Sequence, residues 1–393
     1  MGQPRRSLED VVTRLKDDDR APLFAGAYAG RRVLVTGHTG FKGSWLTAWL
    51  LKLGATVCGY SIDVPSEPSL FEMAGFAGRI RHETGDVRDG AHFAEVLASF
   101  RPDFVFHLAA QAIVSQSYHD PLETLSTNVL GTACVLQALR AVDRPCVAII
   151  ITSDKAYENV EWPWGYRETD RLGGKDVYSA SKGAAELAFH AFLFSFFNRP
   201  DLPVRLATTR AGNVIGGGDW AADRIVADCI RAWTEGGVVE IRSPAATRPW
   251  QHVLEPLSGY LALAARLAND PALHGESFNF GPRAEQNSTV VKLLQDLASV
   301  WGFDNPAKCF SIVGNVPFHE AGLLKLNCDK ALLMLRWEPN LTYDECVRMT
   351  GDWYRDVLKD GRDALEVTTE QIVAYEASAS ERGRVWRRTE AAA

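Results

Sequence analysis

A tyrosine and a lysine four residues apart form the most suggestive reactive pair in the chain. Tyr178 and Lys182 lie in the run Tyr-Ser-Ala-Ser-Lys, at the start of a strongly apolar segment. Residues four apart share one face of a helix, so the ammonium can approach the phenol. A nearby positive charge lowers the pKa of a phenol, which would make Tyr178 a general base near neutral pH. The alternative interpretation is an ordinary surface pair.

A second polar group follows a buried apolar run. Ser153, Asp154 and Lys155 come directly after Cys-Val-Ala-Ile-Ile-Ile-Thr. In open α/β sheets, ligands bind at the carboxyl ends of the strands. Ser153 could therefore hydrogen-bond a reacting hydroxyl beside Tyr178, and Asp154 with Lys155 could serve as an acid–base pair. Without the Tyr/Lys pair, the same two residues would be read as a solvated turn.

A glycine-rich turn precedes both groups. Gly37, Gly40 and Gly43 are spaced G-x-x-G-x-x-G between an apolar run and a helical pattern. A pyrophosphate requires backbone N–H donors at a helix N-terminus and no side chains in the way. The spacing predicts dinucleotide binding, and a tight structural turn is the alternative.

The elements that position these motifs alternate regularly along the chain. The short strands are continuously apolar, which predicts a parallel, doubly wound Rossmann-like sheet with a smaller C-terminal substrate-binding domain. We expect strands near 31–37, 55–62, 79–83, 103–110, 146–154 and 202–214. We expect helices at 38–54, 91–100, 122–142, 179–197, 287–302 and 341–358.

The domain organisation follows from where this alternation begins and ends. Residues 1–29 are a polar N-terminal extension with room for one short helix, and 30–210 form the dinucleotide-binding domain, to which 245–280 return. The pattern loosens after about residue 211 into loops and short strands. Residues 211–244 and 281–360 are therefore expected to bind substrate, and 361–393 to form a C-terminal helix and tail.

Composition narrows the class of protein. The 393 residues are 46% hydrophobic and 23% charged, typical of a globular chain. A net charge of -7 gives no basic face for nucleic acid. The first residues lack the apolar core of a secretory signal, and no apolar run is long enough to span a membrane. The seven cysteines form no C-x-x-C motif. We therefore expect reduced thiols, no metal site, no membrane partner and a cytoplasmic location.

Longer segments of residues 31–345 resemble the extended short-chain dehydrogenase/reductases of the nucleotide-sugar branch. Within that branch the resemblance is strongest to the 4,6-dehydratases that act on CDP-glucose. Other sugar dehydratases usually carry Asp-Glu at the position of Asp154-Lys155, and the 4-epimerases usually have no such pair. The segments that carry the resemblance include TGHTGFKGSWL, GDVRD, TNVLGT, TSDKAYEN, YSASKGAAEL, RAGNVIGGGDWAADR and ATRPWQHVLEPLSGYL.

The resemblance implies an activity. A hydro-lyase of this kind converts CDP-D-glucose to CDP-4-keto-6-deoxy-D-glucose and water by internal hydride transfer through bound NAD. Tyr178 would take the proton of the carbon-4 hydroxyl, Lys182 would hold the cofactor ribose, and Asp154 would be the acid. Lys155 would be either a neutral base or a charged stabiliser of the enolate. Another nucleotide-sugar dehydratase, an epimerase or a non-catalytic NAD-binding regulator are the alternatives.

The resemblance also assigns ligand-binding residues. Ser61 falls where an aspartate would be expected for the cofactor ribose, with Asp63 two residues on, and Lys42 or Arg88 could favour a phosphate. NAD is favoured over NADP. Ser115 replaces a common arginine, so one cofactor or substrate contact is expected to be absent. The cofactor set is Gly37, Thr39, Gly40, Phe41, Lys42, Gly43, Ser61, Asp86, Val87, Leu108, Ala109, Ala110, Asn128, Tyr178 and Lys182.

The nucleotide-sugar substrate should contact residues mainly beyond the sixth strand. Arg248 is suited to a bidentate contact with the pyrophosphate, with a structural loop arginine as the alternative. Gln111, Asn213 and Arg224 complete the predicted substrate set.

The helix at 179–197 is apolar on more than one face, including Phe192, Phe194 and Phe196. Such a helix requires a second partner besides the sheet. Together with the helix near 123–142, it could form a four-helix interface about a two-fold axis, as in the enzymes that the chain resembles. We therefore predict a homodimer. The alternative is that C-terminal helices of the same chain cover this surface.

Overall fold

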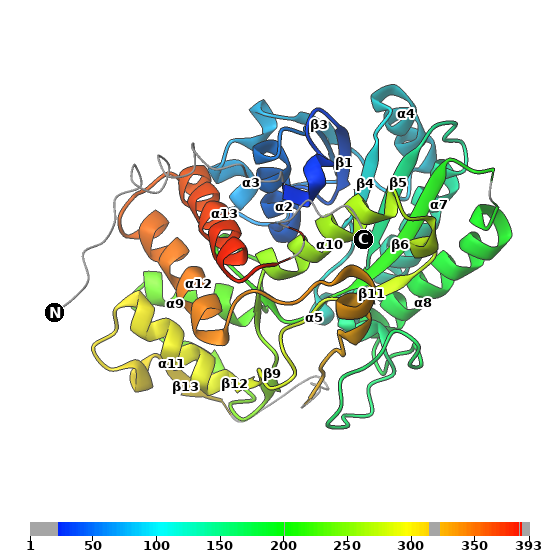
Figure 1. Ribbon diagram of the computed structural model, residues 1–393. Coiled ribbons are helices and arrows are strands. Elements are labelled where there is room, and N and C mark those ends of the chain that lie inside the picture. Colours follow the sequence, from blue (N-terminus) through cyan, green and yellow to red (C-terminus); the bar gives the residue numbers. More distant parts are fainter. Residues whose placement is uncertain (1–22, 200, 314–322, 385, 387–393) are drawn as a thin grey trace.

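The computed structural model describes residues 23–199, 201–313, 323–384 and 386 (Figure 1). The helix considered within residues 1–29 lies largely outside these residues. The described part contains a seven-stranded parallel sheet in the order β11-β6-β5-β4-β1-β2-β3. Its strands are β1 (Arg32–Thr36), β2 (Thr56–Ser61), β3 (Arg81–Thr84), β4 (Phe104–His107), β5 (Cys146–Ile151), β6 (Val204–Arg210) and β11 (Ser277–Asn279). The six predicted strands and the parallel sheet are confirmed.

Helices cover both faces of this sheet, and successive residues of a strand face opposite layers. In β1, Val33 and Val35 pack into one apolar core, whereas Leu34 packs into the other. The first core contains α2 (Phe41–Lys52) and α10 (Leu254–Leu267). The second contains α4 (Gly90–Phe100), α7 (Gly131–Leu139) and α8 (Val177–Phe192). The sheet is therefore doubly wound, as predicted.

The strand order reverses between β1 and β4, which are neighbours although β2 and β3 lie between them in sequence. In open α/β sheets such a reversal marks the crevice, at the carboxyl ends of the strands, in which ligands bind. The glycine-rich turn follows β1 and therefore lies at this position. Shorter helices here are α3 (Leu70–Met73), α5 (Val114–His119) and α6 (Pro121–Leu125), with a π-helical turn at Ser126–Leu130 that joins α6 to α7.

The C-terminal half contains more helix than the sequence predicted. The segment after residue 211 was expected to be loops and short strands, but α9 (Ile225–Thr234) and α10 form there. The region continues through α11 (Val290–Trp301), α12 (Tyr343–Leu358) and α13 (Ala364–Glu381), which Figure 1 shows apart from α4, α7 and α8. Its short strands are β7 (Val214–Ile215), β8 (Val239–Ile241), β9 (Thr247–Arg248), β10 (Gln251–His252), β12 (Ser288–Thr289) and β13 (Phe310–Ile312).

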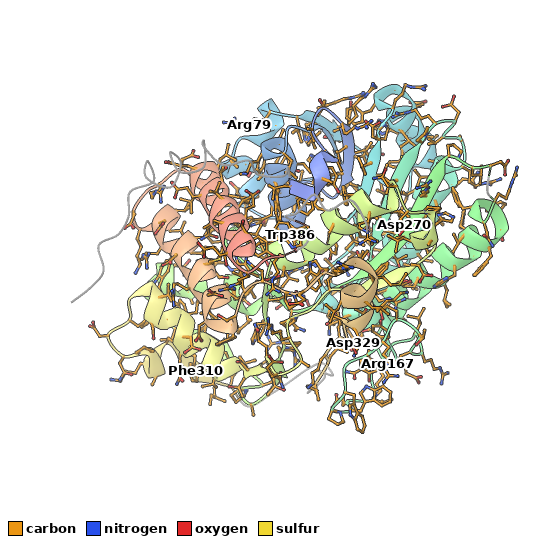
Figure 2. All side chains as sticks on the ribbon, in the orientation of Figure 1. Arg79, Arg167, Asp270, Phe310, Asp329 and Trp386 are labelled. Carbon is orange, nitrogen blue, oxygen red and sulfur yellow. The ribbon has the colours of Figure 1, made fainter. Side chains whose placement is uncertain are left out.

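Aromatic packing joins the two ends of the described chain. Trp386, labelled in Figure 2 near α13 and α10, stacks on Phe24 with ring centroids 5.2 Å apart and on Tyr375 at 5.7 Å. Edge-on contact with Trp49 of α2 completes the cluster. The polypeptide near residue 24 and the end of α13 are thus held against the same face of the sheet. Among the described helices, none is long and apolar enough to cross a membrane.

Candidate functional site

The turn after β1 brings its three glycines against neighbouring backbone. Gly37 has φ +71°, and a Cβ there would lie 2.7 Å from the Ala109 nitrogen. A Cβ on Gly43 would lie 2.1 Å from the Gly37 carbonyl oxygen. Only glycine permits so close an approach. Gly40 caps α2 without a side-chain hydrogen bond. The first-turn amides of α2 therefore meet no capping side chain and are suited to an anion.

The residues predicted for the ribose side are held in an internal hydrogen-bond network. Ser61 Oγ lies 2.8 Å from His38 Nδ1, and His38 Nε2 lies 2.8 Å from His82 Nδ1. Burial, and then the charge of His82, lower the pKa of His38 to about 3, so this imidazole is neutral. Thr39 donates its hydroxyl hydrogen to the Asp63 carbonyl at 2.7 Å. Ser61 thus supports the turn through His38.

Arg88, considered above as a phosphate ligand, is engaged elsewhere. Its guanidinium donates to Asp86 at 2.6 Å and also contacts Glu123. Hydrogen bonding to Arg88 lowers the pKa of Asp86. Asp86, which follows β3, is thus held by the arginine that was considered as a phosphate ligand.

The polypeptide after β4 is fixed by a buried asparagine. Asn128 Oδ1 accepts from the Gln111 backbone amide at 2.8 Å, and its Nδ2 donates to the Gln111 carbonyl at 3.0 Å. The same Nδ2 lies 2.8 Å from Ser181 Oγ on α8. The Gln111 side chain donates to Thr124 at 2.8 Å. Asn128 therefore holds Gln111, which directly follows Leu108–Ala110, against the helix that carries Tyr178.

The predicted catalytic residues come together at the ends of β5 and α8. Asp176 caps α8 by accepting from the Ser179 amide at 2.9 Å, which places Tyr178 in the first helical turn. Ser153 Oγ donates to Asp154 Oδ1 at 3.0 Å, and the same hydroxyl acts to lower the pKa of the Tyr178 phenol. Tyr178, Ser153 and Asp154 are all buried. The two sequence motifs thus form one cluster.

Electrostatics in this cluster differ from the sequence-based expectation. Burial raises the pKa of Tyr178 to about 12, and the Ser153 hydrogen bond only partly offsets it. Lys182 Nζ lies 5.8 Å from the centre of the Tyr178 ring. Burial, followed by the positive charge of Lys42, lowers the pKa of Lys182 to about 7. Burial of both groups therefore opposes the activation of the phenol that the Tyr/Lys spacing predicted.

The Asp154 carboxylate is enclosed by the polypeptide that follows β6. A Cβ on Gly212 would lie 1.8 Å from Asp154 Oδ2, so any larger residue there would displace the carboxylate from this position. Asn213, with φ +53°, lies with Nδ2 3.5 Å from the same oxygen. Gly212 was not predicted as a site residue. No signal in the sequence pointed to it, because the sixth strand was expected to extend over 202–214 and glycine carries no functional group.

The remaining predicted substrate residues occupy the C-terminal side. Arg224 donates to the buried Asp219 at 3.1 Å. Arg248 ends β9 and donates to the Thr247 carbonyl at 2.9 Å. Ser115 hydrogen-bonds Asp223, next to Arg224. Ser115, at the position where the family commonly has an arginine, therefore links α5 to the loop before α9.

Comparison with known proteins found similar sequences over most of the chain. The model of the GDP-mannose 4,6-dehydratase family matches residues 34–350. A CDP-glucose 4,6-dehydratase of Salmonella typhimurium is 45% identical over 88% of this chain and 97% of its own. A dTDP-glucose 4,6-dehydratase of Xanthomonas campestris is 24% identical over 82% of this chain and 92% of its own.

Solved structures support the fold. The dTDP-glucose 4,6-dehydratase of Streptomyces venezuelae, described with NAD and TYD bound, gives a TM-score of 0.72 at 22% identity. The alignment covers 85% of this chain and 99% of that one. An epimerase of Methanothermobacter thermautotrophicus gives 0.71 at 24% identity, over 85% and 95% of the two chains. The extent of the family match and the 45% identity lead to one conclusion: the chain belongs to the GDP-mannose 4,6-dehydratase family, within the extended short-chain dehydrogenase/reductases.

Proposed function

We propose that this protein is a CDP-glucose 4,6-dehydratase, a hydro-lyase that forms CDP-4-keto-6-deoxy-D-glucose. The cluster of Ser153, Asp154 and Tyr178 carries the proposal, because it combines a base for the proton of an alcohol with an acid for elimination. The 45% identity to the Salmonella enzyme supports CDP-glucose as the substrate. A purely binding protein would have no need of a buried proton-transfer group.

NAD fits the turn between β1 and α2. The glycines let the backbone approach a pyrophosphate, and the uncapped first turn of α2 offers donors. Arg88 is paired with two carboxylates, which argues against a 2′-phosphate and therefore against NADP. When bound, NAD would supply a reversible acceptor for the hydride from carbon 4 of the sugar. The full cofactor set predicted above would line this crevice.

Tyr178 is the proposed base for the carbon-4 hydroxyl. The Ser153 hydroxyl acts to lower the pKa of this phenol and would hold the substrate hydroxyl beside it. Lys182 is one helical turn further along α8 and would hold the cofactor ribose. A raised pKa of about 12 means that Tyr178 is protonated before substrate binds. Proton removal is therefore expected to require the positive charge that arrives with the cofactor.

Asp154 and Lys155 are proposed for the elimination. A ketone at carbon 4 acidifies the carbon-5 hydrogen, and Asp154 would protonate the departing carbon-6 hydroxyl. Lys155 belongs to the same short helix, Asp154–Ala156. It would take the carbon-5 proton as a neutral amine or stabilise the enolate as a cation. Return of the hydride to carbon 6 and of a proton to carbon 5 would complete a reaction in which oxidation and reduction balance.

The substrate nucleotide is assigned to the C-terminal part, 211–244 and 281–360, with 245–280 serving the sheet domain. Arg224 and Arg248 would contact the pyrophosphate, with Gln111 and Asn213 nearer to the sugar. Asp219 holds Arg224 in place. All seven cysteines are free thiols, which is consistent with the proposed cytoplasmic location.

Incubation of the enzyme with a panel of nucleotide-glucoses tests the proposal directly. CDP-glucose should lose the mass of one water without net consumption of NAD, because hydride is returned to the sugar. The UDP, dTDP and GDP sugars should react far more slowly. A product of unchanged mass but altered sugar configuration would instead indicate an epimerase, and no reaction with any sugar would contradict the proposal.

We also propose that the protein is a homodimer. Large apolar side chains are exposed on two adjacent segments, the one from α6 to α7 and α8 with the π-helical turn Leu193–Phe197 that follows it. The exposed fractions are 53% for Leu130 on the first segment, and 60% for Leu187 and 70% for Phe194 on the second. The C-terminal helices do not cover this surface, because α12 and α13 pack with α11 and α2. A second copy related by a two-fold axis would bury these side chains.

The dimer should appear in solution as a mass of twice 43.3 kDa at micromolar concentration. Phe194→Glu should convert it to monomer, because the carboxylate would be buried at the interface. Phe194 is a better probe than Phe196, whose ring lies under the Arg140 guanidinium. Leu333→Glu, at a site 82% exposed on another segment, is the control and should leave the mass unchanged. A monomeric wild type in light scattering would refute the proposal.

A further inference from the structure

A buried ion pair lies close to the catalytic residues and has no part in the chemistry proposed above. Arg210 and Glu186 side chains are 1% and 0% exposed. The guanidinium donates from Nε to Glu186 Oε1 at 2.8 Å and from Nη2 to Oε2 at 3.0 Å. Removing two charges from water costs free energy that their pairing often only balances. Stability alone is therefore a weak reason for this pair.

The Glu186 carboxylate joins three elements. Glu186 is on α8, four residues after Lys182 and eight after Tyr178, on the same side of the helix. Its Oε1 accepts from the Thr152 hydroxyl at 2.5 Å. Its Oε2 accepts from the Thr208 hydroxyl on β6 at 2.9 Å. One carboxylate thus connects the catalytic helix to the ends of two strands.

Arg210 extends the connection beyond the catalytic segment. Its Nη1 donates to the Tyr157 hydroxyl at 2.7 Å, and the guanidinium lies 4.8 Å from the centre of that ring. Tyr157 OH donates in turn to Asn279 at 2.8 Å. Thr152 and Tyr157 bracket Ser153–Ala156. Both ends of the segment with the acid–base pair are therefore fixed to one ion pair.

We propose that Glu186, paired with Arg210, is a positioning residue that fixes the segment 152–157 relative to α8. Its carboxylate is buried and paired within the protein, so we assign it no contact with substrate or cofactor. It acts by keeping Ser153 and Asp154 opposite Tyr178, so that the proton-transfer groups lie at reactive distance. The inference rests on the proposed function, since it concerns the turnover of that same site.

Two isosteric substitutions test the inference with matched chemistry. Thr152→Val and Thr208→Val each remove one hydroxyl that donates to Glu186, and both side chains are buried. Only Thr152 adjoins the catalytic segment. Thr152→Val should lower kcat by roughly tenfold to a hundredfold, the cost of misplaced reacting groups, with KM for CDP-glucose unchanged. Both variants should lose a similar amount in Tm, because each loses one buried hydrogen bond. Thr208→Val should nevertheless keep the wild-type kcat.

Thr152→Ser restores the hydroxyl and should restore kcat. Should Thr152→Val fail to fold, Thr152→Cys replaces the hydroxyl by a weak donor of similar size and carries the same expectation. An unchanged kcat at position 152, or an equal loss in Thr208→Val, would overturn the inference. Both results require a wild-type enzyme whose kcat can be measured for comparison. A wild type that is inactive with every nucleotide-glucose would instead refute the proposed function.

Discussion

A Tyr178→Phe variant should lose turnover while keeping its fold and its bound cofactor. The substitution removes one oxygen from a buried ring, and the ring that packs near Lys182 remains. Without the phenol no side chain is placed to take the carbon-4 proton, so we expect a loss of at least about 10²–10⁴, the usual contribution of a positioned base. The rate of product formation from CDP-glucose measures this loss of turnover. Circular dichroism tests whether the variant is folded.

Tyr343→Phe provides the matched control. Its hydroxyl donates to Asp296 at 2.9 Å, outside the candidate site, so the same atom is removed without contact to the proposed chemistry. This variant should retain the wild-type rate. Near-wild-type activity in Tyr178→Phe would show that the base is another group, and the assignment of Ser153, Tyr178 and Lys182 would have to be abandoned.

Asp154→Asn should separate oxidation from elimination. An amide fits beside Gly212 but cannot protonate a leaving hydroxyl. Oxidation at carbon 4 requires Ser153, Tyr178 and Lys182, so the near-ultraviolet absorbance of reduced nicotinamide should still appear after CDP-glucose is added. Formation of the dehydrated sugar should slow by roughly 10²–10⁴. Rapid mixing with mass detection measures both events in one experiment.

The outcome of Asp154→Asn distinguishes roles within the pair. Reduced cofactor that accumulates without dehydrated product supports Asp154 as the acid. Unchanged product formation would contradict that role. It would favour Lys155 as the group that protonates the leaving hydroxyl. Asp296→Asn, a carboxylate paired with Lys292 on the surface of α11, should alter neither phase.

The sequence predicted the sheet because its strands are short, continuously apolar and separated by helices. It also predicted that Ser153 and Tyr178 would meet, since one follows β5 and the other opens the next helix. It did not predict α10. That helix contains Pro256 and Gly259, and nearly all of its residues are buried, so it has no polar face to give it a helical period.

Interactions across the sheet were beyond sequence reasoning for a different reason. Glu186 and Arg210 lie on separate elements, and no spacing rule relates residues of β6 to those of α8. The raised pKa of Tyr178 was missed because the spacing reveals a nearby lysine but not the burial that dominates both groups. Gly212 carries no functional group, so its contact with Asp154 becomes visible only in three dimensions.

The position of the short strand β11 in the sequence affects how the chain folds while it is being synthesised. It closes the edge of β6 by pairing with Thr208–Arg210, yet it is made long after β6. Until Ser277–Asn279 leave the ribosome, β6 presents unpaired backbone groups along an apolar edge, and such edges pair readily between chains. A nascent chain, or a fragment cut at residue 210, should therefore associate with chaperones or with other copies of itself rather than behave as a free-standing nucleotide-binding unit.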